Sequence, residues 1–243
     1  MKKVIFILLV IITLVPGSWL FSQPVFPDAR LPQEEITGNL ARPIGDTSQP
    51  SPFENANHFL MNEWHKGALV LEGGSRLENV NLKYNAFSDQ LYVYNNLIKK
   101  AFIADKETVE SFEINNQANV RQVFKKFYSG EKEQQARYYR VLFTGKHFLL
   151  AFHRITEAKT SLHTDVFGVV RDTEFRKTVT YYMYESSSGY RKILPKRKSF
   201  LSLSQQNKLQ LKNLFKKYGI RNFDEDEMIK AIGLMEAQGF LWQ

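Results

Sequence analysis

Five basic side chains lie within eight residues of the chain, directly after a tyrosine, and this cluster has the clearest potential to bind a ligand. Its members are Tyr190, Arg191, Lys192, Lys196, Arg197 and Lys198. Cationic side chains beside aromatic rings suit acidic polymers, because the cations pair with anionic groups while the rings stack on the polymer. Lysines also protect an exposed edge strand from pairing with other strands. The cluster therefore predicts an anionic-ligand patch, with a solvated edge strand as the alternative.

The five histidines are weaker candidates for metal or acid–base chemistry. Glu63 lies near His65, and His163 lies near Asp165, but neither spacing matches a helical pair of metal ligands. Polar loop or strand positions explain both pairs, so we expect no metal site and no cofactor. The chain contains no cysteine, which excludes zinc–thiolate sites, iron–sulfur clusters and thiol nucleophiles.

No catalytic residue can be assigned from spacing. The serines of residues 186–188 lack the Gly-x-Ser-x-Gly context of a serine nucleophile, and residues 72–75 lack the lysine of a phosphate-binding loop. Both segments are typical of hairpin turns. A pair of carboxylates for glycoside cleavage meets only in the folded protein, so the sequence cannot identify one.

A β-rich domain over residues 57–204 must position these side chains. Val80, Leu82 and Tyr84 alternate with polar residues, which is the period of a strand with one buried face. Turn-forming residues separate such runs at hairpin spacing, and the clearest strand signals cover residues 138–155 and 178–184. The pattern predicts a mainly β fold, an antiparallel meander that is either open or closed into a barrel-like sheet.

Residues 205–243 change to a helical pattern. Leu211 and Phe215 belong to one apolar helix face, and Asp224 with Glu227 resembles a capping box at the start of a second helix. We expect a pair of short helices that packs on the β domain, which makes the fold α+β.

The first 22 residues carry Lys2 and Lys3 before an apolar run over residues 4–15, as a cleaved signal peptide does. A membrane anchor needs about 20 apolar residues, and Pro16 interrupts the run too early. Residues 23–56 are rich in proline and predict a partly extended leader. We expect an exported chain that is periplasmic, outer-membrane-associated or extracellular. No cysteine follows the signal, so we expect neither a lipid anchor nor a transmembrane span after cleavage.

Two segments of the sequence, NEWHKG at residues 62–67 and LKYNAFSDQL at residues 82–91, carry a resemblance. This part of the chain resembles a group of exported bacterial β-rich proteins of unknown function, which end in a lysine-rich helix pair. The resemblance implies a β-rich fold and supplies no activity.

The charge of the chain indicates its partners. Without Lys2 and Lys3 the 33 basic residues fall to 31, against 25 acidic ones, which leaves a net charge of +6. A basic surface favours anionic partners. We expect a non-enzymatic binding or structural module of the bacterial cell envelope whose partner is an envelope protein or an anionic polymer. Export argues against nucleic acid. An envelope-polymer hydrolase and an anionic-surface or lipid-binding protein are the alternatives.

Overall fold

The computed structural model describes residues 55–240, apart from residues 98, 116–117, 119, 129–134 and 166–167. The expected signal peptide, residues 1–22, lies outside the described residues. So does the expected leader, residues 23–56, except for Asn55 and Ala56.

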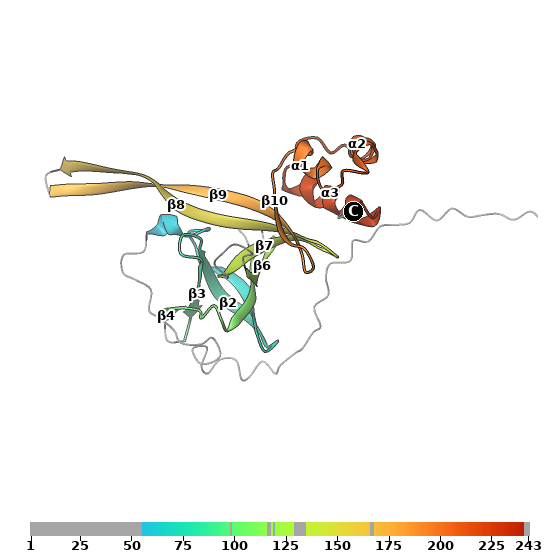
Figure 1. The fold of residues 1–243 in the computed structure, drawn as a ribbon. Helices are drawn as coiled ribbons and strands as arrows, with labels where there is room; N and C mark the ends of the chain where they lie inside the picture. Colours follow the sequence, from blue (N-terminus) through green and yellow to red (C-terminus); the bar gives the residue numbers. More distant parts are fainter. Residues whose placement is uncertain are drawn as a thin grey trace, which may run out of the picture.

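Ten antiparallel strands form one sheet, with the order β10-β9-β8-β7-β6-β5-β1-β2-β3-β4 (Figure 1). The strands are β1 (His65–Leu71), β2 (Arg76–Asn85), β3 (Gln90–Asn95), β4 (Lys100–Ile103), β5 (Val109–Asn115), β6 (Arg121–Tyr128), β7 (Ala136–Thr144), β8 (Phe148–Asp165), β9 (Gly168–Glu185) and β10 (Gly189–Ile193). The predicted antiparallel β fold is confirmed. The strand order is that of an open sheet, because in the described part of the chain no ladder joins β4 to β10.

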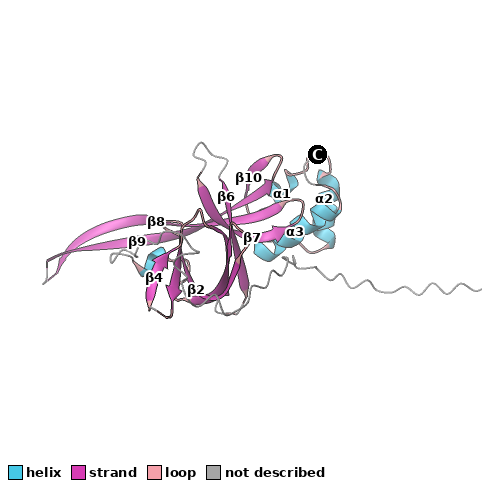
Figure 2. Cartoon of the chain, turned by 90° about the horizontal axis from the view of Figure 1, so that it is seen from below, coloured by secondary structure: helices cyan, strands magenta, loops and turns pink. Residues whose placement is uncertain are grey.

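The strands around β2, β6 and β7 wrap into a tight curl (Figure 2). Its inner side, which we call the first concave face, is filled by alternate side chains of these strands. Val80, Leu82 and Tyr84 are all buried, as their spacing predicts. The rings of Phe112 and Phe124 stack at its centre, 4.8 Å apart. These residues form the main hydrophobic core.

The sheet also curves in the opposite sense. In a flat sheet, β6 and β10 would lie about 19 Å apart, since each strand spacing is about 4.8 Å. The rings of Phe127 on β6 and Tyr190 on β10 are only 6.5 Å apart. The strands β6–β10 therefore enclose a second concave face on the other side of the sheet. Its cluster contains Phe127, Tyr139 and Leu150, with half-buried rings packed around them.

Three helices cover one end of the sheet: α1 (Arg197–Leu201), α2 (Lys208–Lys217) and α3 (Glu225–Ala237) (Figure 1). Leu211 and Phe215 are buried, as predicted. Asp224 caps α3, because its side chain accepts a hydrogen bond from the Glu227 amide at 2.9 Å. The Glu227 carboxylate accepts hydrogen bonds from the amides of residues 221–223, so the predicted capping box is present only in its Asp224 half. The predicted helix pair corresponds to α2 and α3, and α1 is an additional short helix.

The strands β8 and β9 are each 18 residues long and extend beyond the body as a two-stranded ribbon (Figure 1). We call residues 156–176 the arm. The strand signals end at residue 155 and resume at residue 178, so the sequence did not indicate the arm. Phe175, at the base of the arm, packs against the main core beside the rings of His58 and Phe87, but most described side chains of the arm are exposed. The apolar alternation on which strand prediction depends is therefore weak there.

Candidate functional site

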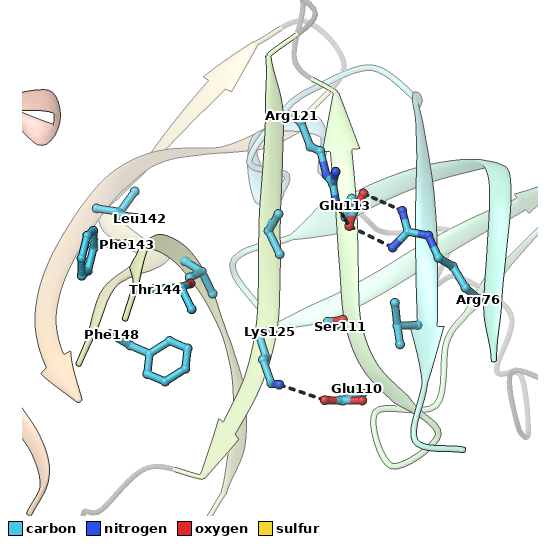
Figure 3. A pocket seen from close by; sticks show the side chains of 13 residues that line it. Arg76, Glu110, Ser111, Glu113, Arg121, Lys125, Leu142, Phe143, Thr144 and Phe148 are labelled. Atoms are coloured by element: carbon cyan, nitrogen blue, oxygen red, sulfur yellow. Dashed lines mark hydrogen bonds and ion pairs between the residues drawn. The ribbon is translucent and has the colours of Figure 1, made fainter. Parts of the chain in front are cut away.

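A cavity of about 500 Å³ opens on the side of the sheet that carries the second concave face (Figure 3). One wall is formed by the outward-facing side chains of β5 and β6, and the other by the ends of β7 and β8. The first wall is charged and the second is apolar. We call this cavity the groove.

Ion pairs hold the charged wall together. Arg76 donates two hydrogen bonds to the Glu113 carboxylate, at 3.0 and 2.8 Å, and Arg121 pairs with the same carboxylate (Figure 3). Lys125 pairs with Glu110 at 2.9 Å. Both carboxylates of the wall are thus matched by cations.

The electrostatics of Glu113 follow from these contacts. Burial acts to raise the pKa of this carboxyl, but the hydrogen bonds from Arg76 and Arg121 outweigh it and hold the pKa below its usual value. Glu113 therefore stays ionised near neutral pH. A general acid needs a raised pKa, and a general base needs a free lone pair directed at its substrate. Glu113 meets neither requirement.

The apolar wall consists of Val141, Leu142, Phe143 and Phe148. It continues into the aromatic cluster of the second concave face, since the rings of Phe127 and Phe148 lie 5.7 Å apart. Burial raises the pKa of Tyr190 in that cluster, so its phenol is neutral. The groove thus combines an apolar surface with the half-exposed cations Arg121 and Lys125, and it suits an amphipathic ligand with an acidic group.

The predicted anionic-ligand patch is divided by the fold. Tyr190 pairs with Tyr184, and Lys192 with Tyr182, so both belong to the aromatic side of the sheet. Arg191 alternates to the opposite side. Lys196 precedes α1, and Arg197 and Lys198 begin that helix. The structure does not bring the six residues together on one surface.

Part of this patch joins a larger basic surface. Arg197 donates a hydrogen bond from Nη2 to the Lys212 carbonyl at 3.2 Å, which places it beside α2. Lys208, Lys212 and Lys216 are exposed at four-residue spacing on α2 and form a stripe beside the buried Leu211 and Phe215. We call Arg197 and these three lysines the basic helical surface.

The sequence contains a signal for this surface that the local cluster alone does not reveal. Residues 186–223 include ten lysines and arginines and no aspartate or glutamate. The predicted patch ends at Lys198 and therefore leaves out the second half of this run. A count of acidic residues would have found it.

The histidines have structural surroundings. His147 is buried, with Nδ1 3.2 Å from Glu236 and Nε2 3.8 Å from Glu185, and it joins the turn between β7 and β8 to α3. His153 packs near the Phe124 ring. The side chains of His163 and Asp165 lie outside the described part. Among the side chains that the structure describes, no group of three could hold a metal ion.

Comparison of the chain with known protein families, with curated proteins and with solved structures gives no match. Within the described ranges, every helix is too short or too polar to cross a membrane.

Proposed function

We propose that this chain is an exported, non-enzymatic binding module of the bacterial cell envelope, and that the groove holds its ligand. One observation carries this proposal: the groove is open and partly apolar, yet both carboxylates on its wall are neutralised by adjacent cations. This arrangement supports recognition over hydrolysis, because acid–base catalysis needs a carboxyl group that can exchange a proton with the substrate.

The ligand chemistry follows from the two walls. An apolar group of the ligand contacts Phe143 and Phe148, where it displaces water from half-buried rings. An acidic group lies near Arg121 and Lys125, whose side chains are 49% and 37% exposed and can form further hydrogen bonds. An amphipathic, acidic segment of an envelope protein meets both conditions.

A photo-crosslinking residue at Thr144 tests this proposal in intact cells. Thr144 lines the groove and is exposed, so it can reach a bound ligand without disturbing the core. We expect one defined adduct from this position. A crosslinker at Leu97, which is 67% exposed in the turn between β3 and β4, is the matched control and gives no such adduct.

Variants of the groove distinguish a specific adduct from a random encounter. Phe148→Ala removes part of the apolar wall, and Arg121→Glu reverses the half-exposed charge, so each abolishes the Thr144 adduct. Adduct formation that survives both changes would contradict binding in the groove. So would turnover of a cell-wall polymer by the purified protein that Glu113→Gln abolishes.

A second candidate function is binding to an anionic surface or lipid headgroup through the basic helical surface. The observation that favours it is the acid-free run of residues 186–223, which includes α1 and α2. Clustered cations without intervening carboxylates attract anionic surfaces, and this attraction is screened by salt.

Charge reversal tests this candidate. The triple change of Lys208, Lys212 and Lys216 to glutamate abolishes salt-sensitive binding to vesicles that contain phosphatidylglycerol. The same reversal of Lys66, Lys99 and Lys100, which are exposed on the opposite part of the sheet, is the control and preserves binding. Equal binding by both triple variants would refute a role for the basic helical surface.

A further inference from the structure

The arm has one long, uninterrupted free edge. The strand β9 pairs with β8 along its whole length, but with β10 only at residues 181–185. For the strands that the structure describes, none pairs with this second edge between residues 168 and 180. At about 3.3 Å per residue the free edge is about 43 Å long. Its sequence contains no proline, so every residue can take part in a β-ladder.

The free edge of β8 is different. The β8–β9 register shifts between Glu157 and Lys159, which marks a β-bulge on β8. Bulges twist an edge and discourage pairing with another strand. The β8 edge is protected in this way, whereas the β9 edge is regular and available.

We propose that two copies of this chain form a dimer by antiparallel pairing of their β9 edges, centred on Phe175. Residues that lie directly opposite each other in an antiparallel pair point to the same face of the sheet. A two-fold axis perpendicular to the sheet therefore passes between two copies of the same residue, one from each chain. With Phe175 there, Glu174 of one copy lies opposite Arg176 of the other, and the contact occurs twice. Both side chains are exposed and lie on the same face of the strand.

Neighbouring registers are excluded by charge. Centring on Thr173 places Asp172 opposite Glu174 of the second copy, and centring on Glu174 places that carboxylate opposite itself. Like charges that lie directly opposite each other destabilise a strand pair, whereas opposite charges stabilise it. The Phe175 register is the one that matches charges, and it ends at Thr180, where β10 begins to occupy the edge.

Exposed apolar side chains lie at both ends of the proposed interface. Val169, near the tip of the arm, is 72% exposed, and Leu194, directly after β10, is 46% exposed. The Phe175 register brings Val169 of one copy close to Leu194 of the other. Pairing also converts a two-stranded ribbon, which is marginally stable alone, into a four-stranded sheet. The dimer thus covers surfaces that the monomer leaves exposed.

The test measures the molecular mass of the protein purified from the cells that produce it, by sedimentation equilibrium over a range of micromolar concentrations. We expect the wild type to be dimeric. Arg176→Glu places a carboxylate opposite Glu174 of the second copy and weakens dimerisation by about tenfold or more. Adding Glu174→Arg to that variant restores opposite charges and restores the dimer. Arg176 lies opposite Thr156 within its own ribbon, so the single change introduces no like-charge pair there.

Asp172→Lys is the matched control, because Asp172 faces the uncharged Thr178 of the second copy in this register and its reversal leaves the dimer intact. A wild-type protein that stays monomeric throughout the range would overturn the proposal. A dimer that resists Arg176→Glu, or one that the added Glu174→Arg fails to restore, would overturn it equally. Circular dichroism of each variant verifies that the fold is retained.

Discussion

The two concave faces of the sheet use alternate side chains of the same strands for different purposes. On β6, Phe124 is fully buried on the first concave face, whereas Val123 and Lys125 face the groove. The first face is filled by large apolar side chains, whereas the second surrounds a small buried cluster with half-buried rings beside an open cavity. The comparison shows how one sheet can fold on one side and bind on the other.

The polar groups of the two faces also differ, in how far they are exposed to solvent. On the first concave face, Asp89 accepts hydrogen bonds from the Tyr84 hydroxyl at 2.6 Å and the Tyr138 amide at 3.3 Å, and it pairs with Lys106 at 2.6 Å. This network ties the β2–β3 turn to β7 and closes the curl. The ion pairs of the groove are partly solvated, so a ligand can contact them.

The largest expected difference between the two faces concerns their aromatic rings. Phe112→Ala leaves a cavity in the first face and lowers the free energy of unfolding by about 4 kcal/mol. Phe148→Ala in the groove costs about 1 kcal/mol, because this ring is only partly buried. Urea denaturation measures both values. Equal losses would show that the second face is as closed as the first.

Removal of the partly buried carboxylate of Asp89 has the next largest expected effect. Asp89→Ala leaves the Lys106 ammonium and the Tyr84 hydroxyl without their partner and lowers the free energy of unfolding by about 3 kcal/mol. Asp172→Ala, on the exposed arm, is the control and changes it by less than about 0.5 kcal/mol. If Asp89→Ala left the free energy of unfolding unchanged, the hydrogen bonds and ion pair of Asp89 would not be what closes the curl.

The pH dependence of stability tests the interior of the first face at His153. Burial, and then the charge of Arg140, lowers the pKa of His153 to about 4 in the folded protein. The unfolded chain protonates this histidine near pH 6.5, so it binds more protons than the folded protein between these values. The contribution of His153 to the free energy of unfolding therefore keeps its full value above pH 6.5 and decreases as the pH falls from 6.5 to about 4.

The expected loss from His153 is about 2–3 kcal/mol. The difference between the wild type and His153→Phe isolates it, because the phenylalanine cannot titrate. Thermal melts from pH 7 to pH 4 measure the difference. Parallel curves for the two proteins would show that His153 protonates in the folded state and that the face is open to water.

The smallest expected effect is at the charged wall. Glu113→Gln removes the carboxylate that pairs with Arg76 and Arg121 and lowers the free energy of unfolding by about 1 kcal/mol, because both arginines keep access to water. Urea denaturation at neutral pH measures it. A loss above about 3 kcal/mol would place this pair among buried ion pairs and would contradict an open groove.

The sequence predicted those parts of the fold in which one set of side chains is buried. Val80, Leu82 and Tyr84 alternate, and Asp224 caps a helix, because each feature depends on near neighbours in the chain. The groove depends on distant partners: Arg76 and Glu113 are 37 residues apart. Spacing carries no information about such pairs. The predicted basic cluster was divided because the chain turns from β10 into α1 within it.

The titration of the Glu113 carboxyl group tests the central claim, that the groove binds a ligand without catalysing a reaction. Carbon-detected NMR of the side chain, followed from pH 8 to pH 2, measures its pKa directly. The claim predicts a midpoint below the ordinary value for glutamate, because Arg76 and Arg121 stabilise the carboxylate. A midpoint of about 6 or above, typical of a carboxyl group that acts as a general acid, would contradict it.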